Sequence, residues 1–259
     1  MTQRGEFVWY ELMTSDPKAA QNFYTDVVGW GTQPFENSMG MDYTMWTKGE
    51  APVGGVMELP EEARKGGAPP HWIGYVAVPD VDAAAEKAQE LGGRVIHGPH
   101  DIPEVGRFAI LADPQGAVVS AFKGAQEMSR EQKDPEPGDV AWHELATSDY
   151  GAAFDFYSTL FGWDKQQAMD MGEAGMYQMY GLGERMLGGM YNKSADMPFP
   201  PHWLYYFATA DLDGAAKKIE EKGGKIMVGP MEVPGGGRIV IGTDPQGAAF
   251  ALHQGPSAS

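Results

Sequence analysis

The chain has 259 residues, of which 36 are acidic and 19 are basic, so its formal net charge is −17. An acidic surplus of this size repels phosphate backbones and anionic lipid headgroups, which argues against nucleic acid or a membrane surface as a partner. The sequence contains no cysteine, which excludes disulfides, thiolate nucleophiles and zinc–thiolate sites. With 42% hydrophobic residues the chain can bury one or two cores, and a small-molecule partner is the simplest expectation.

No segment of the sequence carries a membrane or secretion signal. The apolar runs fall far short of the roughly 20 residues that a membrane-spanning helix needs. Residues Met1 to Tyr10 lack the apolar core of a signal peptide. The sequence therefore predicts a cytoplasmic protein.

The first predicted elements are a strand and a helix. The strand covers Phe7 to Met13, where aromatic and apolar side chains are frequent. The helix begins after Asp16, a residue type favoured at the N-cap, and ends before Gly29, a residue type favoured just past a helix. Pro17 suits the first helical position. The enclosed apolar residues recur at helical spacing and give the helix one apolar face: Ala19, Ala20, Phe23, Tyr24 and Val27.

The same pairing of a strand with a helix occurs three more times along the chain. The Asp-to-Gly interval of thirteen residues recurs at Asp80 to Gly93, Asp149 to Gly162 and Asp211 to Gly224. The strands predicted before these helices are Trp72 to Val78, Val140 to Ala146 and Trp203 to Thr209. Further strand-like segments follow each helix, and in the second and fourth repeats an Asp-Pro-Gln-Gly turn joins the last two of them. The sequence therefore predicts an α+β fold of four βαβββ modules.

The four modules group into two homologous halves. Trp9, Glu11, Tyr24 and Trp30 recur 133 positions later as Trp142, Glu144, Tyr157 and Trp163. The motifs Pro-Pro-His-Trp at residues 69–72 and Asp-Pro-Gln-Gly at residues 113–116 recur 131 positions later. Between the halves, residues 124–139 are polar and lack an apolar period, which predicts a linker. The predicted domains are therefore residues 1–123 and residues 140–259.

These features together resemble one known family. The tandem modules, the Asp-Pro-x-Ala-Ala-x-x-Phe-Tyr helix that begins at Asp16, the helix from Asp80 that ends in Gly-Gly and the Asp-Pro-Gln-Gly turn are similar to the vicinal oxygen chelate superfamily. That superfamily includes glyoxalase I, bleomycin- and fosfomycin-resistance proteins and extradiol dioxygenases. The resemblance covers nearly the whole chain outside the linker, and is strongest to two-domain glyoxalase-like members. It implies two tandem domains, each with a U-shaped cavity where a metal and a substrate usually sit.

The residues at the family's metal positions do not suit a metal. In metal-dependent members, a His or Gln on the first strand of each module and a Glu on the last strand supply the ligands. The resemblance places these positions on Trp9, Ile73, Trp142 and Leu204, and on Ser120 and Ala251. Glu58, with Asn192 as its counterpart in the third module, is the one carboxylate offered, and a catalytic metal generally takes three protein ligands. We therefore expect no standard metal and no other cofactor, while a displaced site of Glu144, His202 and His253 stays open as an alternative.

Two glutamates are the candidate catalytic residues. Trp9 and Glu11 alternate onto one face of the first strand, as Trp142 and Glu144 do in the second half. One hypothesis makes each glutamate a polar group in an apolar cavity, able to act as a general base or to anchor a ligand. The structural alternative is a carboxylate bound to backbone N–H groups or to an arginine. The sequence leaves both open.

Several further residues are candidate ligand contacts. Trp9 and Trp142 could stack on a planar ligand, although a tryptophan on a strand is more often core. His71 and His202 follow Pro-Pro at strand starts near the rim of the expected cavity, where bonding to the backbone is the alternative role. The set of candidate ligand-binding residues is Trp9, Glu58, His71, Trp142, Asn192, His202 and His253.

Two functions are compatible with this sequence. The first hypothesis is a metal-independent protein that binds a small, largely apolar or aromatic molecule in its sheet cavities, as drug-binding members of the superfamily do. The second is an enzyme of the same superfamily, a glyoxalase-like lyase or isomerase or a hydroxylase- or dioxygenase-like protein, with displaced metal ligands or a glutamate base. In either case the expected partner is a small molecule, and the chain is expected to be a monomer or a homodimer.

Overall fold

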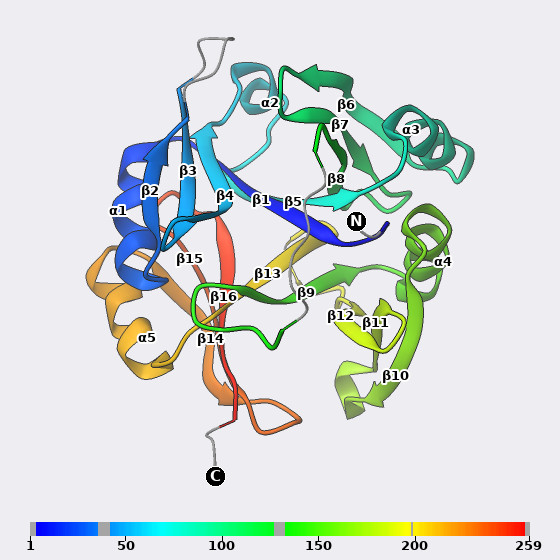
Figure 1. Cartoon of the computed structure of the whole chain (residues 1–259). Coiled ribbons are helices and arrows are strands. Elements are labelled where there is room, and N and C mark those ends of the chain that lie inside the picture. The colour runs from blue at the N-terminus through cyan, green and yellow to red at the C-terminus, as the bar shows by residue number, and fades with distance from the viewer. Residues whose placement is uncertain (1–3, 36–41, 127–132, 198, 257–259) are drawn as a thin grey trace. The chain divides into compact units, whose positions relative to one another are not determined.

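The computed structural model describes residues 4–35, 42–126, 133–197 and 199–256, and its elements follow the predicted order (Figure 1). The first half consists of β1 Phe7–Thr14, α1 Pro17–Val27, β2 Gly31–Pro34, β3 Tyr43–Lys48, β4 Ala51–Glu58, a short α2 Glu61–Lys65, β5 His71–Ala77, α3 Val81–Glu90, β6 Arg94–Ile102, β7 Gly106–Ala112 and β8 Val118–Gly124. The second half consists of β9 Val140–Thr147, α4 Tyr150–Phe161, β10 Asp164–Asp170, a 3-10 turn Gly172–Ala174, β11 Met176–Leu182, β12 Arg185–Asn192, β13 His202–Ala208, α5 Leu212–Glu221, β14 Lys225–Glu232, β15 Arg238–Thr243 and β16 Ala249–Gln254.

The strands form two eight-stranded sheets, which confirms the predicted α+β fold of four βαβββ modules. The strand orders are β2-β3-β4-β1-β5-β8-β7-β6 and β10-β11-β12-β9-β13-β16-β15-β14. Within every module the first strand pairs parallel to the last strand, and the remaining neighbours run antiparallel. None of the helices in the described residues combines the length and the apolar character that crossing a membrane requires.

By packing, the chain divides into two compact units that each draw on both halves of the sequence. The first unit comprises residues 1–9, 73–132 and 142–203, and the second comprises residues 10–72, 133–141 and 204–259. The second and third modules thus contribute to one unit, and the first and fourth modules to the other. Figure 1 shows α3 beside α4 in the first unit and α1 beside α5 in the second. The exact domain boundaries predicted from the sequence stay a prediction.

The helices begin where the sequence predicts. Each of the four capping aspartates accepts a hydrogen bond from the backbone N–H three residues later, at 2.9–3.0 Å. At the C-terminal ends, Gly29 and Gly162 adopt positive φ as expected, with angles of 87° and 80°. In α3 and α5, however, the positive φ falls one residue before the predicted glycine, on Gly92 (86°) and Gly223 (84°).

The second glycine of each Gly-Gly pair has a different physical role. A Cβ on Gly93 would lie 2.7 Å from the backbone oxygen of Ala112, and a Cβ on Gly224 would lie 2.7 Å from that of Thr243. Those distances are too short for any side chain. The first glycine therefore ends the helix, and the second lets the chain pass close to the neighbouring strand.

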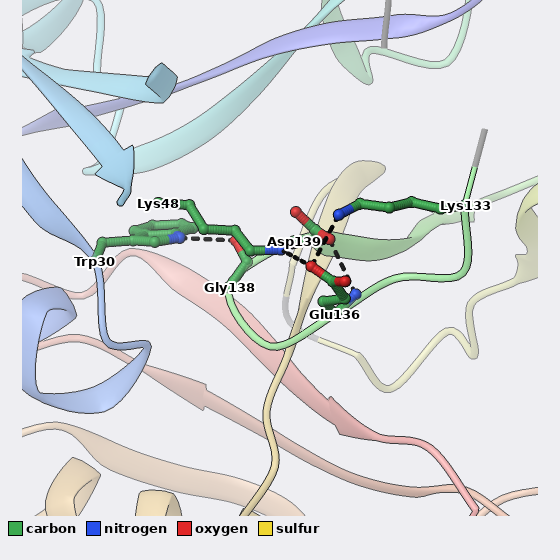
Figure 2. A network of polar contacts seen from close by, with 6 residues as sticks. All are labelled: Trp30, Lys48, Lys133, Glu136, Gly138 and Asp139. Atoms are coloured by element: carbon green, nitrogen blue, oxygen red, sulfur yellow. Dashed lines mark hydrogen bonds and ion pairs between the residues drawn. The ribbon is translucent and has the colours of Figure 1, made fainter. Parts of the chain in front are cut away.

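The described end of the linker is held in place by polar contacts (Figure 2). Lys48 forms ion pairs with Glu136 at 3.0 Å and with Asp139 at 2.8 Å. The indole of Trp30 donates to the carbonyl oxygen of Gly138 at 2.8 Å, and Lys133 pairs with Glu136. Residues 133–139 are therefore attached to the first module, whereas residues 127–132 of the predicted linker lie outside the described residues.

In each unit, a buried tyrosine on a helix links a tryptophan to an aspartate through hydrogen bonds. We call this the Trp–Tyr–Asp chain. In the first unit, the indole of Trp203 donates to the hydroxyl oxygen of Tyr157 at 3.1 Å, and this hydroxyl donates to Asp113 at 3.0 Å. In the second unit, Trp72 donates to Tyr24 and Tyr24 donates to Asp244, at 2.9 and 3.2 Å. Both tyrosines are fully buried. Each chain joins an Asp-Pro-Gln-Gly turn of one half to a helix of the other half.

Replacing Tyr157 by phenylalanine is expected to lower the free energy of unfolding by about 1–3 kcal/mol, because Asp113 and Trp203 each lose a buried partner. Urea unfolding followed by tryptophan fluorescence measures the change. Tyr150→Phe, on the same helix but only half-buried, is the matched control and is expected to stay within about 0.5 kcal/mol of the parent chain. Equal unfolding free energies for the two variants would contradict the role of this chain.

Candidate functional site

The third module brings an indole, two phenols and a carboxylate onto one face of its sheet. Trp142 and Glu144 lie two residues apart on β9, so they share a face. The register places Glu144 beside Gly189 of β12, and it places Tyr177 of β11 beside Tyr191 of β12. A Cβ on Gly189 would overlap the ring of Tyr177. The glycine therefore leaves room for the Tyr177 ring to cross β12 and reach Glu144.

These side chains form a directed chain of hydrogen bonds. The indole N–H of Trp142 donates to the hydroxyl oxygen of Tyr177 at 2.7 Å, and the Tyr177 hydroxyl donates to Oε2 of Glu144 at 2.9 Å. Because an indole N–H can only donate and an ionised carboxylate can only accept, the direction of both bonds is fixed. The ring of Tyr191 stacks beside that of Tyr177, with 6.1 Å between their centroids. We call Trp142, Glu144, Tyr177 and Tyr191 the Trp–Tyr–Glu site.

The electrostatics of the site keep both phenols protonated. Burial raises the pKa of Tyr177, and the negative charge of Glu144 raises it further. Burial and then the charge of Glu144 raise the pKa of Tyr191 to about 12. The site therefore presents hydroxyl groups, aromatic faces and a carboxylate at neutral pH. A ligand with a planar ring and a hydrogen-bond donor would complement that set.

The first module repeats the strand register and the glycine clearance of this arrangement. Glu11 lies beside Gly55, Tyr43 lies beside Met57, and a Cβ on Gly55 would overlap the Tyr43 ring. Trp9 stands two residues before Glu11 on the same face of β1. Met57 thus occupies the position that Tyr191 has in the second half. Glu11 is 6% exposed and Glu144 is half-buried, so both glutamates are shielded from solvent to some degree.

Sequence reasoning identified the tryptophans and glutamates but missed the tyrosines. Tyr43 and Tyr177 stand 134 positions apart, close to the repeat of 133, and each is followed two residues later by a methionine. That signal was present in the sequence. The first glycine of the pair on β4, Gly54, lies against the backbone oxygen of Tyr10, and the first of the pair on β12, Gly188, lies against that of His143.

Three of the other predicted site residues form hydrogen bonds with the backbone. His71 and His202 each bond through Nδ1 to the carbonyl oxygen two residues earlier, at 2.8 and 2.9 Å. The side-chain oxygen of Asn192 accepts from the backbone N–H of Tyr150 at 2.7 Å, at the start of α4. Glu58 is exposed at the end of β4. Burial lowers the pKa of His253.

The metal positions implied by the resemblance do not fit a metal in this structure. Trp142 donates its only polar hydrogen to Tyr177, and Ile73 and Leu204 are buried apolar residues. The buried hydroxyl of Ser120 donates to the backbone oxygen of Ala109 at 3.3 Å. Across the described ranges, no group of three or more His, Cys, Asp or Glu side chains could hold a metal ion. The groups that the structure shows at the site are its own side chains. The absence of a cofactor stays a prediction.

Comparison with known proteins places the chain in one family. The family model described as the glyoxalase/bleomycin resistance protein/dioxygenase superfamily matches residues 6–120 and again residues 139–252. The chain belongs to this superfamily. The two matches confirm the resemblance and the two tandem glyoxalase-like domains.

Similar curated proteins carry two kinds of name. The chain is 34% identical over 247 residues to the protein named "Putative glyoxylase CFP32" of Mycobacterium tuberculosis, covering 94% of this chain and 92% of that protein. It is 30% identical over 260 residues to the "Anthracycline biosynthesis protein DnrV" of Streptomyces peucetius, covering 96% and 92%.

Solved structures of low sequence identity share the fold. The 2,3-dioxygenase LapB from Pseudomonas sp. KL28 has a TM-score of 0.67 at 10% identity, covering 99% of this chain and 94% of that chain. The Mn(II)-bound glyoxalase from Novosphingobium aromaticivorans has a TM-score of 0.61 at 17% identity, covering 98% and 83%. At these identities the likeness concerns the fold alone.

Glu144→Gln is expected to lower the pKa of Tyr191 from about 12, because it removes the negative charge that disfavours the phenolate. The shift should stop short of the ordinary value of about 10, since burial, the larger cause, remains. Ultraviolet titration from about pH 9 upwards measures it, with the same chains carrying Tyr191→Phe to identify the residue. Asp155→Asn, at an exposed position of α4, is the control. An unchanged titration in Glu144→Gln would contradict the coupling.

Proposed function

We propose that the protein binds a small aromatic molecule at the Trp–Tyr–Glu site without the standard metal of the superfamily. The observation that supports this most directly is the hydrogen-bonded chain from Trp142 through Tyr177 to Glu144. It holds a phenol and a carboxylate in fixed positions on a sheet face that otherwise presents aromatic rings. Such a combination gives a planar ligand both contact area and one polar anchor.

Each residue of the site would have a different role in binding the ligand. Tyr177 and Tyr191, which lie with nearly parallel rings at 19°, offer faces for stacking. The carboxylate of Glu144 accepts a hydrogen bond from a hydroxyl or amine group of the ligand. Met169 of β10 pairs with Tyr177, and its flexible thioether can adjust to ligands of different shape. The relative whose name refers to anthracycline biosynthesis supports an aromatic ligand.

An enzyme of the same superfamily is the second candidate function. The relative named a glyoxylase supports it, as does the direct hydrogen bond between a phenol and a carboxylate. In that case Glu144 would act as a general base that takes a proton from the substrate, while Tyr177 keeps the carboxylate in position. The reaction class would be that of a glyoxalase-like lyase or isomerase, or of a hydroxylase- or dioxygenase-like protein. We further propose that the protein acts in the cytoplasm, as a monomer or homodimer.

Calorimetric titration with 1-naphthol and with naphthalene tests the binding function. The hydroxyl group can bond to Glu144, so Glu144→Gln is expected to weaken binding of 1-naphthol by about tenfold and to leave the affinity for naphthalene within about threefold. Asp155→Asn is the matched control and should change neither. If neither compound binds the parent chain, the binding function is wrong.

A second assay separates binding from catalysis. Isomerisation of the hemithioacetal of methylglyoxal and glutathione, measured with and without added divalent ions, reports glyoxalase-like activity. Turnover by the parent chain that is lost in Glu144→Gln would favour the enzyme. No turnover under any of these conditions would leave the glyoxalase-like enzyme without support.

A further inference from the structure

The second module carries two histidines on one face of its sheet. His97 and His100 belong to β6, which stands at the end of the strand order of its sheet. The register pairs His97 with Ile110 and His100 with Phe108 of β7, so three steps along β6 correspond to two steps along β7. Because residues two apart on β7 share a face, this bulge in β6 brings both imidazoles to that same face.

The two histidines lie on the face of the sheet that points away from α3. Arg107, the neighbour of Phe108 on β7, forms an ion pair with Asp82 of α3 at 2.8 Å. Side chains alternate between the two faces of a strand, so Phe108 and the histidines are on the opposite face. Both histidines are exposed, and an ion can therefore reach them from the solvent.

Aromatic packing holds the two imidazoles close together. The ring centroids of His97 and His100 are 4.5 Å apart, and they lie 5.9 and 6.4 Å from the ring of Phe108. Tyr75 of β5 contacts Phe108 in turn, at 6.2 Å. Side chains that are already restricted by packing lose less conformational freedom when they bind an ion together. The pair is therefore arranged in advance for a shared ligand.

The separation of the rings matches that of two ligands on one metal ion. A metal–imidazole bond is about 2.0–2.1 Å long, and the ring centroid lies about 1.15 Å beyond the bonding nitrogen. Two imidazoles bound at about 90° thus have centroids about 4.5 Å apart, whereas a tetrahedral angle would separate them by about 5.2 Å. The observed 4.5 Å corresponds to the right angle of square-planar and tetragonal sites, which are typical of Cu(II) and Ni(II). The ion needs one nitrogen of each ring, so the other nitrogen can keep any hydrogen bond that orients the imidazole.

We propose that His97 and His100 together bind one Cu(II) ion at the surface of the second module. Among divalent ions Cu(II) binds nitrogen ligands most tightly, ahead of Ni(II) and Zn(II). Two protein ligands are fewer than the three that a catalytic metal generally takes, so water or an external chelating molecule fills the remaining positions. The site is separate from the family's metal positions, which the resemblance places on Ile73 and Ser120 in this module, and it does not depend on the proposed binding function. The net charge of −17 raises the concentration of cations near the protein.

The fourth module has the same local backbone without the imidazoles. Val228 and Met231 take the positions of His97 and His100, 131 residues later in the sequence. They pair with β15 in the same way, with three steps along β14 for two along β15, and both side chains are exposed. We therefore expect one Cu(II) ion per chain, and the fourth module offers a place to build a second site.

Removal of either imidazole tests the site. Equilibrium dialysis of the full chain against CuCl2 is expected to show one Cu(II) ion bound per chain ahead of any weaker sites, and electron paramagnetic resonance should show a tetragonal ion with nitrogen ligands. His97→Gln and His100→Gln are each expected to weaken this binding at least about tenfold. Ile96→Gln, at the exposed position before His97, is the matched control and should stay within about twofold of the parent chain. Circular dichroism checks that each variant keeps the fold.

Transfer of the pair to the fourth module tests the geometry without removing any ligand. The double variant Val228→His with Met231→His is expected to bind two Cu(II) ions per chain. Either substitution alone should leave the number at one, because a single imidazole lacks the second ligand.

Each outcome decides the inference. Copper binding that is unchanged in both His97→Gln and His100→Gln would assign the ion to other groups and overturn the site. Zn(II) bound as tightly as Cu(II) would contradict the right-angle geometry, and a folded double variant that gains no second ion would contradict the role of the strand register. A parent chain that binds no copper would overturn the inference and leave the proposed binding function standing, since titration with aromatic ligands tests that function separately.

Discussion

The rest of the structure depends on two buried carboxylates, those of Asp113 and Asp244. Burial raises the pKa of each, which expresses the cost of placing a charge away from water, and hydrogen bonds from surrounding donors offset that cost. One oxygen of Asp113 accepts from the three backbone N–H groups of its own turn, and the other accepts from Tyr157. Because Tyr157 belongs to the second half of the sequence, the turn of the first half cannot satisfy its carboxylate alone. The two halves are therefore coupled in folding.

The same coupling supports the candidate site. Tyr157 is on α4, and α4 begins three residues after β9, the strand that carries Trp142 and Glu144. A helix held by a buried hydrogen bond limits how far the preceding strand can move. Gly189 of β12 then leaves space for the Tyr177 ring, so this ring can reach the carboxylate of Glu144. The buried hydrogen bond of Tyr157 and the space beside Gly189 together allow the short hydrogen bonds among Trp142, Tyr177 and Glu144.

The local parts of this architecture were predictable from the sequence, and the long-range parts were not. Capping aspartates, strand segments and the repeat follow from spacing, and the structure confirms them. The hydrogen bond between Asp113 and Tyr157 spans 44 positions, and no local pattern indicates it. Tyr177 recurs visibly in the sequence, but its contact with Glu144 is not predictable from that recurrence, because it depends on the space that Gly189 leaves. The sequence also could not fix the end of α3 to a single residue. Gly92 and Gly93 are both suitable at a helix end, and the structure uses Gly92 where Gly93 was predicted.

The resemblance implies that Trp142 stands where metal-dependent members of the superfamily carry a metal ligand, and an indole at that position has different chemistry. A histidine there would accept a metal, and the cation would compensate the charge of nearby carboxylates. An indole has no acceptor, and here its N–H donates to Tyr177, which in turn donates to Glu144. Two neutral donors in series stabilise the carboxylate, whose charge contributes after burial to the raised pKa of Tyr191. At this position the site therefore offers a donor that is held by its hydrogen-bond partner, where a histidine would offer a metal ligand.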